Sequence, residues 1–264
     1  MMIEFTSSYQ SRINNCSNKK KSPIILALDY DLDNYNNSYL LDKCKEVISL
    51  TESHICAIKI NFHLLLSLSY IQILELNILA HKFDLQSIAD IKLNDIGNTN
   101  KVTVDKLQKL GFDAVIVNPF IGVTEMKSIV NYAHSIKFGI ISLVYMSHPT
   151  SFEGYGLKIS TSNSEHGDNR ESIPMYQLLY AYARLSGADG IVIGGSKIDI
   201  IKEFSSLNEI KIYSPGFLTQ GGSIADAVKA GTDYFIVGRH ILHSSSPVND
   251  LKFILYQITK YKNE

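Results

Sequence analysis

The stretch GADGIVIGG, residues 187–195, places Gly-x-Asp directly before a short run of apolar, mostly β-branched residues. The same pattern recurs as GFDAV at 111–115 and as GTDYF at 231–235. The starting positions 111, 187 and 231 are separated by about two units and one unit of roughly 40 residues, the size of a strand followed by a helix. A chain of 264 residues built from such units is typical of a (β/α)8 barrel, which has about 250 residues.

Eight apolar runs of this kind follow one another along the chain. They alternate with longer segments of helical period, such as 38–53, 124–136 and 175–187, and this alternation favours parallel strands covered by helices. An open doubly wound sheet is the structural alternative, because the number of strands does not establish closure. The runs begin at Ile24, Ile55, Ser87, Asp113, Gly139, Asp189, Ile210 and Asp233.

Two segments fall outside this alternation. Residues 1–22 predict an N-terminal extension, with a short helix around 5–14 followed by a polar link, before a single barrel domain over 23–264. Residues 146–172 have many small and polar side chains and no helical stripe, so we expect a long loop after the fifth strand.

Composition excludes several classes of protein. With 25 Lys and Arg against 26 Asp and Glu, the net charge of −1 gives no field that attracts nucleic acid or an anionic membrane. No apolar run is long enough to span a membrane, and the polar N-terminus lacks the apolar centre of a signal peptide, so we expect a cytoplasmic protein. Cys16, Cys44 and Cys56 are odd in number and lack metal-ligand spacing, which indicates reduced thiols.

Charged side chains stand where several predicted strands end, the position of the active site in a (β/α)8 barrel. In ADIKLNDIGNT, residues 89–99, Asp90 and Lys92 are two apart on a strand and therefore point to the same face, and Asp95 follows the strand. Neighbouring opposite charges keep each other ionised, so Lys92 would be a positioned proton donor. An ordinary ion pair at a strand end is the alternative. The other polar strand-end residues are Asp29, Lys59, Ser147 and Arg239.

The last two strands are followed by glycine-rich segments. SPGFLTQGG comes after the seventh strand and VGRH after the eighth, and these two loops often build a phosphate site in this fold. Glycine lets backbone N–H groups approach an anion, and the Arg239 guanidinium can bind phosphate with two hydrogen bonds. Gln220 adds an amide donor. Turn formation alone also explains the glycines, but the two loops together indicate a phosphorylated ligand.

From about Ile24 to Ile241, these residues resemble the orotidine 5′-phosphate decarboxylase family. The most specific elements are Asp-x-Lys-x-x-Asp continued by IGNT, and the pair SPG…QGG and VGR. The resemblance implies a (β/α)8 barrel that works as a homodimer, without metal or organic cofactor, and converts orotidine 5′-phosphate to UMP and carbon dioxide in pyrimidine biosynthesis.

The resemblance also implies a role for each matching residue. Lys92 would protonate C6 of the pyrimidine, and Asp90 would lie beside the departing carboxylate. Lys59, Asp90, Lys92 and the Asp95 of the other subunit would form an array of alternating charge. The expected substrate-binding residues are Asp29 with Lys59 on the ribose, Ile96 and Thr99 from the other subunit, Ser147 on the pyrimidine, Pro215 lining the pocket, and Gln220, Gly238 and Arg239 on the phosphate.

Three other functions fit parts of the pattern. Magnesium-dependent decarboxylases and aldolases of sugar phosphates share Asp-x-Lys-x-x-Asp, but Lys59 would stand where a metal-binding glutamate is needed, and it would repel the cation. A Schiff-base aldolase would use Lys59 or Lys92 as nucleophile, but the flanking Asp90 and Asp95 would keep Lys92 protonated. A barrel that binds nucleotides without catalysis is the third alternative, and the complete charge array disfavours it.

Overall fold

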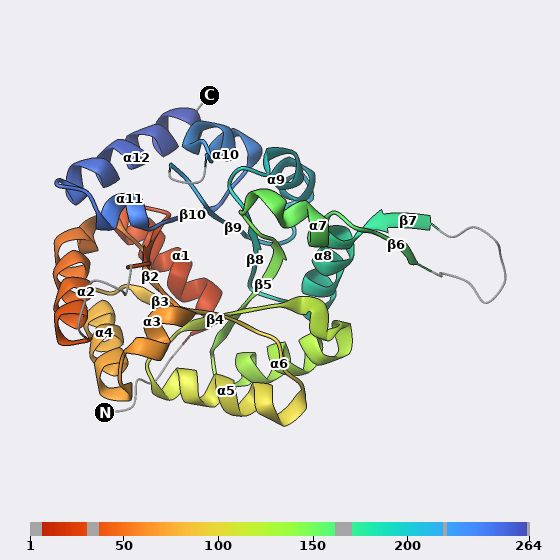
Figure 1. The fold of residues 1–264 in the computed structure, drawn as a ribbon, viewed down its shortest axis with the longest axis horizontal. Coiled ribbons are helices and arrows are strands. Elements are labelled where there is room, and N and C mark those ends of the chain that lie inside the picture. Colours follow the sequence, from red (N-terminus) through yellow and green to blue (C-terminus); the bar gives the residue numbers. More distant parts are fainter. Residues whose placement is uncertain (1–6, 31–36, 162–170, 219–220, 263–264) are drawn as a thin grey trace.

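Eight parallel strands close into a barrel in the order β1-β10-β9-β8-β5-β4-β3-β2, and helices surround it (Figure 1). The computed structural model describes residues 7–30, 37–161, 171–218 and 221–262. All eight predicted strands are present, and closure excludes the open sheet. The barrel strands are β1 (Ile24–Leu28), β2 (Ala57–Asn61), β3 (Gln86–Leu93), β4 (Ala114–Val117), β5 (Gly139–Tyr145), β8 (Gly190–Ile193), β9 (Ile212–Pro215) and β10 (Tyr234–Val237).

The connecting segments between the strands are mainly helical. Their larger helices bury an apolar face against the barrel, as the predicted segments required. The helices are α1 (Tyr9–Lys20), α2 (Asn37–Thr51), η2 (Glu52–His54), α3 (Phe62–Ser67), α4 (Tyr70–Lys82), α5 (Gly97–Lys109), η3 (Pro119–Ile121), α6 (Val123–Ser135), η4 (Pro149–Ser151), α7 (Phe152–Tyr155), α8 (Met175–Ser186), α9 (Ile198–Ser205), α10 (Ile224–Ala230), α11 (Arg239–Leu242) and α12 (Pro247–Lys262).

The Gly-x-Asp repeat has a structural basis at the amino-terminal end of the barrel. Each glycine has positive φ, between 76° and 99°, and follows a helix, a conformation that favours glycine. Each aspartate then makes two hydrogen bonds to the preceding strand: its N–H donates to a backbone oxygen, and its carboxylate accepts the N–H of that same residue. The pairs are Asp113 with Ser87, Asp189 with Ile140 and Asp233 with Ile212.

Helix α1 lies across this same end and is longer than predicted. The expected polar link is wrong, because the helix continues to Lys20, where two lysines in the last turn favour a helix C-terminus. Tyr9, Ile13 and Cys16 are buried against the barrel, and a Cβ on Gly139 would lie 2.4 Å from the Tyr9 ring. Only glycine therefore lets α1 pack this closely on β5.

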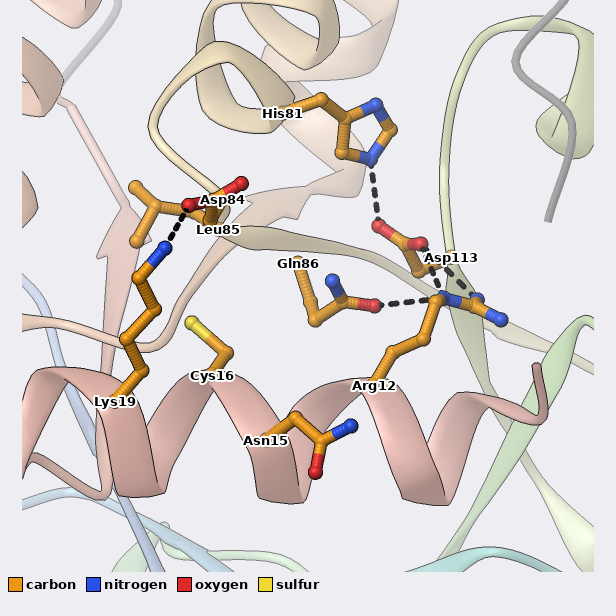
Figure 2. A pocket seen from close by; sticks show the side chains of 9 residues that line it. All are labelled: Arg12, Asn15, Cys16, Lys19, His81, Asp84, Leu85, Gln86 and Asp113. Carbon is orange, nitrogen blue, oxygen red and sulfur yellow. Dashed lines mark hydrogen bonds and ion pairs between the residues drawn. The ribbon is translucent and has the colours of Figure 1, made fainter. Parts of the chain in front are cut away.

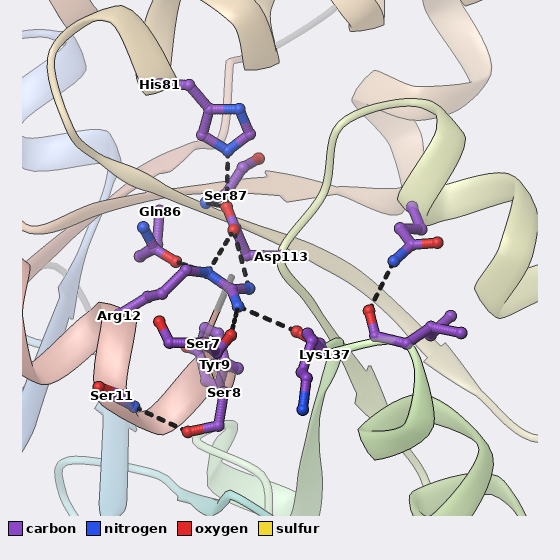
Figure 3. Close-up of polar contacts among 12 residues, drawn as sticks. Ser7, Ser8, Tyr9, Ser11, Arg12, His81, Gln86, Ser87, Asp113 and Lys137 are labelled. Carbon is purple, nitrogen blue, oxygen red and sulfur yellow. Dashed lines mark hydrogen bonds and ion pairs between the residues drawn. The ribbon is translucent and has the colours of Figure 1, made fainter. Parts of the chain in front are cut away.

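Arg12 anchors α1 to the buried carboxylate of Asp113 (Figure 3). Its guanidinium lies 3.0 Å from Asp113 Oδ1, and His81 Nε2 lies 2.8 Å from Asp113 Oδ2. The side chain of Asp113 is only 1% exposed, so this buried carboxylate needs the hydrogen bonds that Arg12 and His81 provide. Beside them is a cavity of about 350 Å³ between α1 and the start of β3 (Figure 2).

The segment after β5 is not a plain loop, which corrects the prediction for 146–172. It contains η4, α7 and a two-stranded antiparallel hairpin of β6 (Lys158–Thr161) and β7 (Glu171–Pro174). The hairpin extends away from the barrel (Figure 1). Among the described residues, no helix is both long enough and apolar enough to cross a membrane.

Candidate active site

The carboxyl ends of β2 and β3 bring three predicted charges together. Lys59 and Asp90 are 5% and 8% exposed, and Lys59 Nζ lies 2.7 Å from Asp90 Oδ2. Lys92 Nζ lies 2.9 Å from Asp90 Oδ1, so the carboxylate sits between two ammonium groups. Burial alone would raise the pKa of Asp90, but Lys59 and Lys92 outweigh it and lower this pKa to about 2. Asp90 is therefore ionised at neutral pH.

Lys92 reaches Asp90 from an unusual backbone conformation. The two side chains meet on one face as predicted, but Lys92 has a φ of 47°, and the pairing of β3 with β4 shifts register between Ala89 and Leu93. A left-handed lysine is strained, since its Cβ crowds the following carbonyl oxygen. Such conformations cluster at functional sites. The side chain of Lys92 is 42% exposed, so its ammonium faces the mouth of the barrel.

Asp29 is the centre of a second polar group, after β1. Its Oδ1 accepts a hydrogen bond of 2.8 Å from Asn61 Nδ2 and lies 3.4 Å from His63 Nε2. Its Oδ2 lies 3.6 Å from Arg239 Nε. The two predicted ligand-binding residues Asp29 and Arg239 are thus an ion pair in this structure.

At the mouth of the barrel, where the carboxyl ends of the strands lie, half of the predicted site residues line one cavity. It also contains Gly216 and Phe217, and Gly238 approaches Ala27 so closely that a Cβ there would lie 3.2 Å from the Ala27 oxygen. Two wider cavities lie at the amino-terminal end, but none of the predicted site residues lines them, whereas six of those residues line the cavity at the mouth. The predicted residues that line the mouth cavity are Asp29, Lys59, Ser147, Pro215, Gly238 and Arg239.

Asp90 and Lys92 do not line this cavity but are joined to it through Lys59, and the other predicted residues are placed differently. Asp95 and Ile96 are exposed between β3 and α5, where the Asp95 carboxylate accepts the N–H of Ile96, and Thr99 is exposed in the first turn of α5. Within the described part of the chain, Asp95 forms no ion pair with Lys59 or Lys92. Gln220 lies outside the described residues.

Sequence reasoning missed Asn61, His63 and Gly194. Asn61 follows Lys59 by two residues, so the alternation that linked Asp90 to Lys92 was the available signal. His63 lies just beyond, at the start of α3. A Cβ on Gly194 would lie 2.6 Å from the Cα of Ser147, so this glycine sets how closely the ends of β8 and β5 approach.

The cysteines offer no thiolate nucleophile. All three are free and buried, and burial raises the pKa of Cys16 to about 11 and that of Cys44 to about 12. Among the described residues, no group of three or more His, Cys, Asp and Glu side chains is arranged to hold a metal ion.

The model of the family described as "Orotidine 5'-phosphate decarboxylase / HUMPS family" matches residues 22–254. The chain belongs to this family. A Pyrococcus furiosus orotidine 5′-phosphate decarboxylase is 30% identical over 243 residues, which cover 91% of this chain and 99% of the relative. The match spans the barrel strands and every predicted site residue, so the resemblance drawn from the motifs is confirmed.

Solved structures agree with this family assignment. The crystal structure of the Pyrococcus horikoshii orotidine 5′-phosphate decarboxylase has a TM-score of 0.68 and 30% identity, covering 89% of this chain and 99% of that one. The Leishmania donovani OMP decarboxylase has a TM-score of 0.80 at 16% identity, with coverage of 97% and 99%, which shows the shared fold. These relatives bear the decarboxylase name, so the magnesium-dependent sugar-phosphate alternative within the barrel group is not favoured.

Proposed function

We propose that this chain decarboxylates orotidine 5′-phosphate to UMP and carbon dioxide, as a cytoplasmic enzyme of pyrimidine biosynthesis. The observation that carries the proposal is the Asp90 carboxylate held between two ammonium groups at the mouth of a barrel whose relatives are decarboxylases. Lys59 and Lys92 supply positive charge in a partly buried place, where it acts most strongly on a reacting group.

Lys92 is the proton donor in this mechanism. When the bond between C6 and the carboxylate breaks, its electron pair stays on C6 and carbon dioxide leaves. The Lys92 ammonium stabilises this negative charge and transfers a proton to C6, and the amine recovers a proton from water. Because the charge on C6 develops only near the transition state, this interaction lowers the barrier rather than merely tightening substrate binding.

Asp90 completes the reacting group. It is ionised at neutral pH, since its pKa is about 2, and it holds both lysines in place. Its carboxylate would lie against the carboxylate of the substrate, and their repulsion would end when carbon dioxide departs. Lys59 at the end of β2 also repels a divalent cation, which supports chemistry without a metal at this position.

The other end of the mouth would bind the rest of the nucleotide. Arg239, Gly238 and Gln220 would hold the phosphate, and Asp29 with Lys59 would hold the ribose. Ser147 would contact the pyrimidine, and Pro215 would line the pocket. Binding energy from the phosphate, remote from C6, can orient the base for reaction.

The homodimer in this proposal explains the exposed residues after β3. Asp95, Ile96 and Thr99 would enter the site of the second subunit, with Asp95 placed beside Lys92. Large apolar side chains follow β2, β3 and β4 at the same end of the barrel and would be covered by that subunit. These side chains are Phe62, Leu66, Ile96 and Phe120, which are 54%, 73%, 67% and 67% exposed.

The deciding experiment follows the ultraviolet absorbance of orotidine 5′-phosphate in the presence of a chelator. We expect turnover by the wild type, no measurable turnover by Lys92→Ala with unchanged circular dichroism, and a KM raised on the order of 10- to 100-fold by Arg239→Ala. Loss of wild-type turnover on adding chelator would favour the magnesium-dependent alternative. Substantial turnover by Lys92→Ala would remove its role as proton donor.

A further inference from the structure

One neutral side chain, Asn61, lies between the two charged groups of the mouth. Its Nδ2 donates to Asp29 Oδ1 at 2.8 Å, and its Oδ1 accepts a hydrogen bond from Lys59 Nζ. An amide has a donor end and an acceptor end, so it can bind a carboxylate and an ammonium at once. Asn61 is also the last residue of β2, a rigid element.

Through Asn61 the two charged groups form one continuous polar chain. On one side, Asp29 is paired with Arg239, at the expected phosphate end. On the other side, the Asp90 carboxylate accepts hydrogen bonds from both Lys59 and Lys92, at the expected site of decarboxylation. The order of the chain is Arg239, Asp29, Asn61, Lys59, Asp90 and Lys92.

The neutrality of Asn61 matters because its two neighbours carry opposite charges. Without the amide between them, Lys59 and Asp29 would attract each other directly. Lys59 is only 5% exposed, so water screens this attraction weakly. A shift of Lys59 toward Asp29 would take it away from Asp90, leaving that buried carboxylate with Lys92 alone.

We propose that Asn61 is a positioning residue that orients Asp29 and keeps Lys59 on Asp90, and that it thereby couples the phosphate end of the site to the decarboxylation end. The inference rests on the proposed function. Asn61 touches neither the pyrimidine C6 nor the phosphate in this scheme, and it acts through Asp29 and Lys59.

Two variants separate the two ends of the amide. Asn61→Leu has a similar size and removes both hydrogen bonds, so kcat should fall and KM should rise, each on the order of 10-fold or more. Asn61→Asp keeps the acceptor for Lys59 but sets a second carboxylate against Asp29. We expect it to retain kcat within about threefold while raising KM at least 10-fold at pH 8.

A pH profile distinguishes this role from a loss of packing. Two adjacent carboxylates share a proton at a higher pH than a single carboxyl group does, so the KM defect of Asn61→Asp should shrink between pH 8 and pH 6. His63, Arg239 and Lys59 also face this place. Because the wild type contains the same three groups, the ratio of the KM of the variant to that of the wild type isolates the new carboxylate.

A double-mutant cycle tests the coupling itself. The loss in kcat/KM from Arg239→Ala should be at least about threefold smaller in the Asn61→Leu background than in the wild type. Asn118→Leu is the matched control, because Asn118 also lies at the carboxyl end of a barrel strand, directly after β4, but its side chain accepts the N–H of Phe120. Arg239→Ala and Asn118→Leu should combine multiplicatively.

The inference is overturned if Asn61→Leu leaves kcat and KM within twofold of the wild type, or if its cycle with Arg239→Ala is multiplicative. The inference is also overturned if Arg239→Ala and Asn118→Leu show the same departure from multiplicative losses in kcat/KM, because the coupling would then reflect a general disturbance of the fold. If Asn61→Leu does not fold, the pH profile of Asn61→Asp decides. Failure of the proposed function is distinct, because the wild type itself would then not consume orotidine 5′-phosphate.

Discussion

Lys92, the proposed proton donor, has a strained backbone conformation. Its φ of 47° belongs to the left-handed region, which costs a residue with a Cβ about 1 kcal/mol or more relative to glycine. The register shift of β3 at this point places the ammonium at the mouth while Asp90 stays buried beside it. The strain is therefore linked to the placement that the mechanism needs.

This conformation predicts an unusual order of stability. Lys92→Gly and Lys92→Ala should both lack decarboxylase activity, but Lys92→Gly should have the larger free energy of unfolding, by about 1 kcal/mol, because glycine adopts positive φ without strain. Urea unfolding measures the difference. Lys106, exposed inside α5, is the control, since Gly there should be less stable than Ala by a similar amount. If the Gly variant is less stable than the Ala variant at position 92 as well as at position 106, Lys92 does not have a left-handed conformation.

The low pKa of Asp90 predicts how the stability of the fold depends on pH. Its folded pKa of about 2 is below the unfolded value of 3.8, so its ionisation stabilises the fold above pH 4, and this contribution is lost as the pH falls toward 2. Asp90→Asn should therefore reduce the free energy of unfolding at pH 6, with a difference from the wild type that shrinks between pH 4 and pH 2. Denaturant titrations at several pH values measure it. If the difference in the free energy of unfolding between Asp90→Asn and the wild type stays constant with pH, the pKa of Asp90 is not lowered in the folded state.

At the scale of elements, the sequence was most informative where strands bury both faces. Strands β1 and β5 are buried at every position, and apolar except for Ser142, because helices cover one face and the barrel interior the other. The Gly-x-Asp repeat was also visible, since each copy ends a helix and links two strands by the same pair of hydrogen bonds.

The missed elements are those with little apolar surface to bury. In β6, Lys158 and Ser160 are exposed and Ile159 is only partly buried, so the strand has one apolar side chain and is too short for a period to be recognised. Helix α1 was predicted but too short, because its one apolar stripe of Tyr9, Ile13 and Cys16 lies among polar residues. Asn61 and Gly194 were missed for another reason: each lies against a residue that follows the neighbouring strand, Asp29 after β1 and Ser147 after β5, and those contacts depend on strand pairing that no local pattern shows.

The attachment of α1 to the barrel can be tested at Arg12. Arg12→Ala removes one cation from an Asp113 carboxylate that is 1% exposed, and it should lower the free energy of unfolding by about 2–3 kcal/mol. Activity of the folded protein should be unchanged, because the mouth is at the other end. Lys19→Ala is the matched control on the same helix, where the ion pair with Asp84 is 67% and 63% exposed and screened by water, so its loss should leave the free energy of unfolding nearly unchanged. Equal losses from the two variants would refute the anchoring role of Arg12.

At the scale of the whole molecule, the two ends of the barrel differ in kind. The amino-terminal end has the repeated aspartate contacts and the covering helix, and its polar groups are closely paired. The mouth has a left-handed lysine, a buried carboxylate between two ammonium groups, and exposed apolar side chains. The contacts at the amino-terminal end thus stabilise the fold, and this stability offsets the backbone strain and the buried charges at the mouth, which the proposed chemistry requires.

The proposed exchange of Asp95 across a dimer can be tested by mixing inactive variants. In a hybrid of Asp95→Ala and Lys92→Ala subunits, the site of the first subunit has its own Lys92 and the intact Asp95 of its partner, whereas the other site lacks both. Random exchange at equal amounts makes half of the dimers hybrids, each with one intact site, so about a quarter of wild-type activity should return.

The matched control for this experiment mixes Lys92→Ala with Asp90→Asn. Asp90 and Lys92 contact each other within one chain, at 2.9 Å, so every site in that hybrid lacks one of them and no activity should return. Subunit exchange is verified with two distinguishable tags in both mixtures. If the mixture with Asp95→Ala also stays inactive although hybrids form, Asp95 does not act across the interface. Recovery in both mixtures would show instead that Asp90 and Lys92 serve different sites.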